Sequence, residues 1–118
     1  MEISQPGAPK SFYELWNAAA FACSNPATWE DYDLSAIVPA GVHEVLVEQT
    51  AAALTATPTV GVRKKGSALN RQWICMRDAA DSAKNFIICE CDDNQVIQCY
   101  ESVLTAGGIE WRVAGYWL

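Results

Sequence analysis

The final segment of the 118-residue chain, residues 109–118, is its most strand-like stretch. An extended backbone places alternate side chains on one face, here Ile109, Trp111, Val113, Gly115 and Trp117. Tryptophan and tyrosine are favoured on such half-buried pleated surfaces. The end of a chain usually frays unless a sheet holds it. We therefore predict a central or well-covered strand that closes the domain, with Trp111 and Trp117 in the core.

The composition is that of one ordinary globular domain. Hydrophobic residues make up 51% of the chain and charged residues 19%. The net charge of −6 argues against a nucleic-acid partner, because phosphate binding requires a basic face. No apolar run approaches the ~20 residues that cross a bilayer, so no membrane partner is expected. The start, MEISQPGAPK, lacks the apolar core of a signal peptide.

Residues 1–28 are predicted to form an arm and a short helix, separate from the remainder of the chain. Ser11 and Glu14 have the spacing of a capping box. Apolar residues follow at helical spacing, namely Phe12, Leu15, Trp16, Ala19, Ala20 and Cys23. Asn25-Pro26 ends this pattern, so the helix is expected over residues 12–23. Phe12 and Trp16 form a large stripe for such a helix, which makes them candidate interface residues.

Residues 29–118 carry strand signals at short intervals. Strands are expected at residues 34–38, 42–55, 59–64, 72–77, 84–91, 95–103 and 109–118. This spacing favours a mainly β fold, an antiparallel β-sandwich or jelly roll with the short N-terminal helix and arm. The segment Asp92-Asp93-Asn94 is the strongest hairpin signal. Its odd length pairs Cys89 with Ile97 and gathers the apolar residues on one face.

The candidates for chemistry have simpler structural explanations. The cysteines are Cys23, Cys75, Cys89, Cys91 and Cys99, and an odd count without a signal peptide favours free thiols. A Cys-x-Cys pair on a strand holds its sulfurs about 7 Å apart, unlike the turn-borne pairs of zinc sites. His43 has no nucleophile motif to serve. The acids at 30–33 and 92–93 lack EF-hand spacing and are typical of turns. We therefore expect no catalytic residue, no metal and no cofactor.

Two further groups are candidate contact residues. Arg63-Lys64-Lys65 is the one basic run, and it lacks the frame of a phosphate-binding loop. It is expected to be a solvated turn or a patch that pairs with an acidic neighbour. Trp29, like Trp16, flanks the predicted helix and is a better interface candidate than a core residue.

The order of several short segments resembles a β-sandwich module of tailed-bacteriophage virion proteins. The segments are Tyr32-Asp33-Leu34-Ser35, Val38-Pro39-Ala40-Gly41, Arg63-Lys64-Lys65-Gly66-Ser67, Ile97 to Tyr100, and Val113-Ala114-Gly115-Tyr116-Trp117. The likeness covers residues 29–118. The order of these segments carries the resemblance.

The resemblance implies a non-enzymatic structural protein of the virion. Such modules are small jelly rolls that often trimerise, and a free-standing one resembles a capsid decoration or cement protein. Its expected partners are the major capsid protein and further copies of itself, as a homotrimer on the capsid surface, after assembly in the host cytoplasm. The alternative is a tail or head fibre knob that binds the host surface. A small metal-dependent enzyme is disfavoured by the missing ligand set.

Overall fold

The structure, a computed structural model, describes residues 10–52, 57–69, 72–74, 82–104 and 108–118. These residues form β-strands and, within the described ranges, no helix. The strands are β1 (Phe12–Glu14), β2 (Glu30–Asp33), β3 (Glu44–Ala52), β4 (Thr59–Lys64), β5 (Gln72–Ile74), β6 (Ser82–Glu90), β7 (Val96–Glu101) and β8 (Ile109–Trp117). The prediction of a mainly β protein is confirmed. None of the described residues belongs to a helix that could span a membrane.

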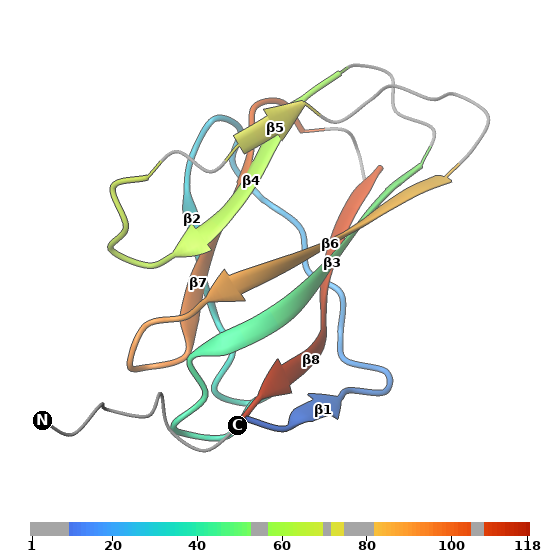
Figure 1. Cartoon of the computed structure of the whole chain (residues 1–118). Helices are drawn as coiled ribbons and strands as arrows, with labels where there is room; N and C mark the ends of the chain where they lie inside the picture. The colour runs from blue at the N-terminus through green and yellow to red at the C-terminus, as the bar shows by residue number, and fades with distance from the viewer. Residues whose placement is uncertain (1–9, 53–56, 70–71, 75–81, 105–107) are drawn as a thin grey trace, which may run out of the picture.

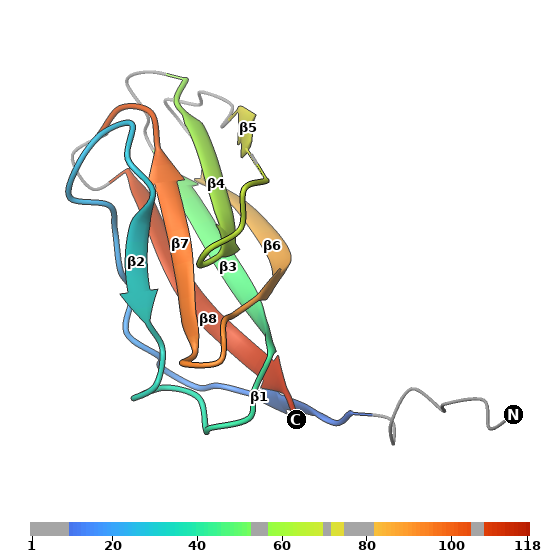
Figure 2. The same ribbon diagram turned by 90° about the vertical axis from the view of Figure 1, so that its left-hand side faces the viewer.

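The strands make two antiparallel sheets of four strands each (Figure 1). The first sheet has the order β1-β8-β3-β6, and the second has the order β2-β7-β4-β5. In Figure 2 the second sheet lies in front of the first, so the two form separate layers. The buried side chains come from both sheets, which places the core between the layers.

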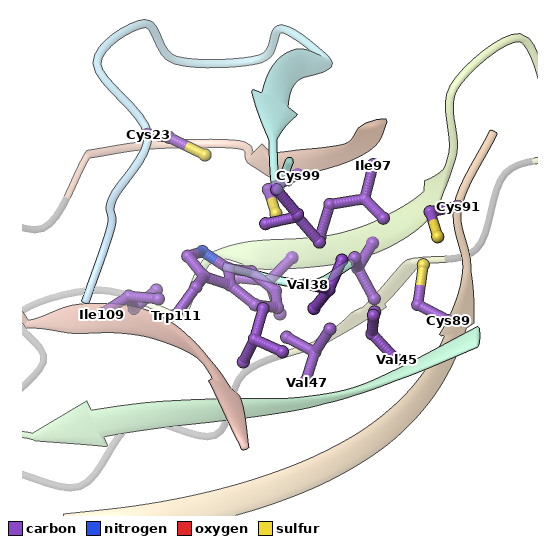
Figure 3. Close-up of a cluster of buried hydrophobic side chains, with 14 of the residues drawn as sticks. Cys23, Val38, Val45, Val47, Cys89, Cys91, Ile97, Cys99, Ile109 and Trp111 are labelled. Carbon is purple, nitrogen blue, oxygen red and sulfur yellow. The ribbon is translucent and has the colours of Figure 1, made fainter. Parts of the chain in front are cut away.

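Valine, isoleucine and cysteine dominate this core, with one large aromatic side chain at its centre. Trp111 of β8 is 0% exposed, and Val45 and Val47 of β3 pack in the same cluster. In Figure 3, Ile97 and Cys99 of β7 point toward these residues from the opposite layer. The alternation of buried and half-buried positions along β3 is complete from Glu44 to Ala52, as the sequence predicts for a one-sided strand.

The last strand occupies an interior position in its sheet, as predicted. β8 lies between β1 and β3 and pairs with both. Its first half keeps the expected alternation, with Ile109, Trp111 and Val113 buried and Glu110 and Arg112 exposed.

A register shift changes the second half of β8. Val47 lies opposite Val113 whereas Leu46 lies opposite Gly115, so β8 holds one extra residue there. A shift of one residue moves all following side chains to the other face. Gly115 and Trp117 therefore share the outer face with Leu46, and Tyr116 packs against the core instead. The prediction that Trp117 lies in the core with Trp111 is wrong, because an alternation rule cannot anticipate a bulge.

The predicted helix at residues 12–23 is also wrong. Phe12–Glu14 form the edge strand β1, and Phe21 makes an isolated antiparallel bridge with Trp111. Asn17 has a φ of 60°, which a right-handed helix excludes. Two of the apolar residues at helical spacing have partners on β8 instead: Phe12 pairs with Trp117, and the Leu15 N–H donates to the Ala114 carbonyl. The Phe12 and Trp117 rings lie 4.8 Å apart, which illustrates this pairing.

The hairpin predicted around residues 92–94 does not form. β6 pairs with β3, and β7 pairs with β2 and β4, so residues 91–95 connect the two sheets. Ile97 lies opposite Tyr32 and Lys64, not opposite Cys89. Cys89 and Ile97 are both buried nevertheless, because the inner faces of the two sheets look toward each other. Burial is thus predicted correctly while the strand partner is not.

Residues 34–38 form a turn instead of the expected strand. The backbone N–H groups of Ile37 and Val38 both donate to the Leu34 carbonyl, and β2 precedes this turn. The strand predicted at 59–64 coincides with β4, and the turn after it contains Gly66 at a φ of 86°. Residues 53–55 and 75–77 of two further predicted strands lie outside the described residues.

Candidate interaction surface

The structure places the predicted contact residues in or beside different sheets. Phe12 is in β1, partly exposed, and Trp16 follows in the next loop at 81% exposure. Trp29 directly precedes β2, and Arg63 and Lys64 end β4. Both strands belong to the second sheet. The candidate contact residues therefore form two separate groups of side chains.

A polar network joins three strands on the outer face of the second sheet. Lys65 Nζ lies 2.7 Å from Asp31 Oδ2, and Gln98 Nε2 donates to Asp31 Oδ1 at 2.9 Å. Arg63 Nε in turn donates to Gln98 Oε1 at 2.8 Å. The Lys65 ammonium and the Gln98 amide lower the pKa of Asp31, and Asp31 raises the pKa of Lys65. Lys65 of the basic run thus pairs with Asp31, an acid of the same chain that lies in β2.

Aromatic side chains continue this network. The Arg63 guanidinium carbon lies 4.0 Å from the centroid of the Trp29 ring, and the Trp29 and Tyr100 rings lie 5.2 Å apart. Both rings are partly exposed, and Lys64 is exposed at the neighbouring end of β4. We call Trp29, Arg63 and Tyr100 the Trp29 cluster. A guanidinium stacked on an aromatic platform is a surface that planar or sugar-like groups can contact.

An apolar stripe crosses the outer face of the first sheet. The cross-strand pairs Phe12–Trp117 and Leu46–Ile88 put these side chains on one face with Phe86 of β6. We call Phe12, Trp117, Leu46, Ile88 and Phe86 the outer stripe. Phe86 and Ile88 are each 57% exposed, and Phe12 is exposed as well. Large apolar side chains gathered on one sheet face mark a contact surface more often than isolated ones.

Carboxylates border the outer stripe. The register places Glu14, Glu44, Glu48, Glu90 and Glu110 on the same outer face. Three cations lie on or beside this face: Arg112 opposite Glu48, Lys10 paired with Glu44 at 3.8 Å, and Lys84 paired with Glu48 at 2.9 Å. The rim is therefore acidic overall with an apolar centre, a pattern that suits a partner with a basic rim.

The sequence gives no indication of the most deeply buried carboxylate. Glu101, at the end of β7, is 2% exposed. Its Oε2 accepts hydrogen bonds from the Cys23 backbone N–H at 3.1 Å and from Trp111 Nε1 at 3.2 Å. It thereby ties the segment before β2 to the centre of β8. A buried acid at the end of a strand has no local sequence signal, since it is defined by partners far along the chain.

The remaining candidates for chemistry have structural roles. Glu30 accepts hydrogen bonds from the Ser24 and Asn25 backbone N–H groups, and Asp92 accepts from Asn94 and Val96. Asp92 thus has the turn role that the sequence predicts, whereas residues Glu30–Asp33 form the strand β2 and not the expected turn. Among the described residues, no three His, Cys, Asp or Glu side chains are placed so that they could hold a metal ion.

The thiols are buried wherever the structure describes them. These are Cys23, Cys89, Cys91 and Cys99, whereas Cys75 lies outside the described residues. Burial, followed by the charge of nearby Glu101, raises the pKa of Cys23, and burial raises that of Cys99 well above its ordinary value. Because the thiolate is the reactive form, these side chains are suited to packing and not to nucleophilic chemistry. His43 is exposed, and its carbonyl accepts the Cys91 N–H.

Comparison with known proteins adds no family to this description. No family model matches the chain, and no curated protein matches it. The two surfaces described above and the order of the sequence segments are therefore the features of this chain that bear on its function.

Proposed function

We propose that this chain is a non-enzymatic structural protein of a tailed-bacteriophage virion, most specifically a capsid decoration protein. In this proposal the two sheets constitute a β-sandwich of the jelly-roll type. The resemblance over residues 29–118 supports the virion assignment. Its partners are the major capsid protein and further copies of itself, arranged as a homotrimer on the capsid surface.

The outer stripe is the observation that carries the proposal. A decoration protein adds buried area over the joints between shell subunits, which requires an exposed apolar face with a polar rim. The first sheet offers such a face, from Phe12 at one edge to Phe86 at the other. Its acidic border selects a shell surface with basic residues around an apolar centre.

Binding to shells that lack the protein tests the proposal. Purified protein is mixed with such shells of the encoding phage and sedimented, and saturable binding of many copies per shell is expected. Phe12→Ser, which removes an exposed ring of the outer stripe, should weaken the binding. Leu69→Ser is the matched control, since Leu69 is also exposed but follows β4 of the second sheet. Absence of the protein from the shells of intact virions overturns the proposal.

The Trp29 cluster favours one alternative, a fibre knob that binds host-surface sugars. Aromatic rings beside a guanidinium provide a stacking platform for sugar rings. Under this alternative Trp29→Ala abolishes binding to host glycans while Trp16→Ala does not. The protein would then occur in few copies, at a fibre tip.

A further inference from the structure

The strand β6 is a long and regular sheet edge. It has nine residues and pairs with β3 through an unbroken register from Glu44–Glu90 to Ala52–Ser82. Among the described residues no strand pairs with its other side, because β6 ends the order β1-β8-β3-β6. Natural edge strands usually carry proline, a bulge or several charges that discourage further pairing. β6 has no proline, and its exposed centre is Phe86 and Ile88.

The hydrogen-bond pattern decides which backbone groups of β6 face outward. The Cys91 N–H donates to the His43 carbonyl, so residue 91 points toward the β3 side. In an antiparallel pair successive residues alternate in direction. The backbone N–H and C=O groups of Lys84, Phe86, Ile88 and Glu90 therefore point away from β3. They are the groups available to another strand.

We infer that β6 pairs with β6 of a second copy of this chain, antiparallel about a twofold axis at Ile87. In this register Lys84 lies opposite Glu90 of the second copy, and Phe86 lies opposite Ile88. Each such pair joins two residues whose backbone groups face outward, so both hydrogen bonds of each pair can form. The inference does not depend on the proposed virion function.

The side chains of β6 are self-complementary in this register and not in the neighbouring one. Opposite charges meet at both ends, and the exposed Phe86 and Ile88 of the two copies form one apolar cluster. Among the described residues Glu90 has no cationic partner, and Lys84 is exposed beside Glu48. An axis at Phe86 would instead place each Lys84 against an Ile88. The charge pattern thus favours a second copy as the occupant.

Disulfide trapping tests the register. In the proposed arrangement the two Ile87 residues meet at the axis as a non-hydrogen-bonded pair, with Cα atoms about 4.5 Å apart, a distance that a disulfide spans. Ile87→Cys is expected to give a cross-linked dimer under mild oxidation, with the 87–87 disulfide identified by peptide mass spectrometry. Phe86→Cys is the matched control, because it cross-links only if the axis lies at Phe86. Efficient trapping through Phe86→Cys and not Ile87→Cys overturns the proposed register.

Charge exchange tests the same contact without a new thiol. Each of Lys84→Glu and Glu90→Lys creates a like-charge pair at both ends of the interface, because the axis duplicates every contact. Each should weaken dimerisation about tenfold, as expected for two exposed cross-strand pairs. The double variant should restore it. Glu110→Lys on β8 changes the charge of the same face equally and should leave dimerisation unchanged.

Sedimentation velocity and thermal unfolding are measured for every variant, so that loss of folding is distinguished from loss of association. The twofold contact predicts a dimer, or a hexamer if the proposed threefold contact also forms. A monomer at high concentration, or a trimer insensitive to both charge reversals, overturns the inference. An assembly whose association is the same in the wild type, the single charge variants and the double charge variant also overturns the inference.

Discussion

The buried carboxylate of Glu101 supports the sharpest stability prediction. Its Oε2 accepts one hydrogen bond from the Cys23 N–H and one from Trp111 Nε1, and both donors lie inside the fold. Glu101→Ala removes the acceptor and leaves both donors without it. An unsatisfied buried donor costs about 1–3 kcal/mol, so the pair amounts to about 2–6 kcal/mol.

Removing a buried charge recovers part of that cost, because a carboxylate is expensive to desolvate. We therefore expect Glu101→Ala to lower the free energy of unfolding by about 3 kcal/mol. Glu101→Gln retains a neutral acceptor at the same place and should lose only about 1 kcal/mol.

Urea unfolding followed by tryptophan fluorescence measures these differences. Glu110→Ala is the matched control, because Glu110 is exposed beside Trp111 and should change stability by less than about 0.5 kcal/mol. Native-state labelling of Cys23 provides a local readout, since loss of the Glu101 bond should speed its reaction. If Glu101→Ala unfolds at the same urea concentration as the wild type, and Cys23 labelling is unchanged, the two hydrogen bonds that Glu101 accepts do not contribute to the stability of this fold.

The other predictions concern alkaline pH, the β1 edge and the Trp29 cluster. Burial keeps the Cys99 thiol protonated in the fold at pH values above its ordinary pKa of 9.0, whereas the unfolded chain loses this proton. The free energy of unfolding should therefore fall as pH rises above 9, by at most about 1.4 kcal/mol per pH unit for this thiol. A pH series on the wild type and Cys99→Ala checks this. Gly115→Ala places a Cβ against the Phe12 ring and the Tyr13 backbone carbonyl and should cost about 1–3 kcal/mol, measured by thermal unfolding; an unchanged midpoint would mean that both the ring and the β1 backbone shift freely. Arg63→Lys loses the planar stacking on Trp29 and should lower the free energy of unfolding, measured in urea, by about 0.5–1 kcal/mol. An unchanged free energy of unfolding would show that this contact does not stabilise the fold.

Side-chain periodicity alone predicted much of the core of this protein, although not the outward position of Trp117 or the burial of Glu101. The alternation along residues 44–52 and the first half of 109–117 is local, and the strand at 59–64 has the predicted bounds. The burial of Cys89, Ile97 and Cys99 also follows from their neighbours in sequence. The candidate contact residues Phe12 and Trp16 are exposed, although no helix carries them.

Only the tertiary structure decided which strands pair and where each face changes. A strand pattern at residues 82–90 fits a hairpin with 96–101 as well as it fits pairing with β3, and the two differ in contacts far apart in the chain. Residues 12–14 and Phe21, which lie within the predicted helix 12–23, pair with β8 for the same reason. The extra residue opposite Leu46 and Val47 turns Trp117 outward and so completes the outer stripe. Periodicity records the environment of a side chain, whereas the choice of partner depends on the free energy of the whole fold.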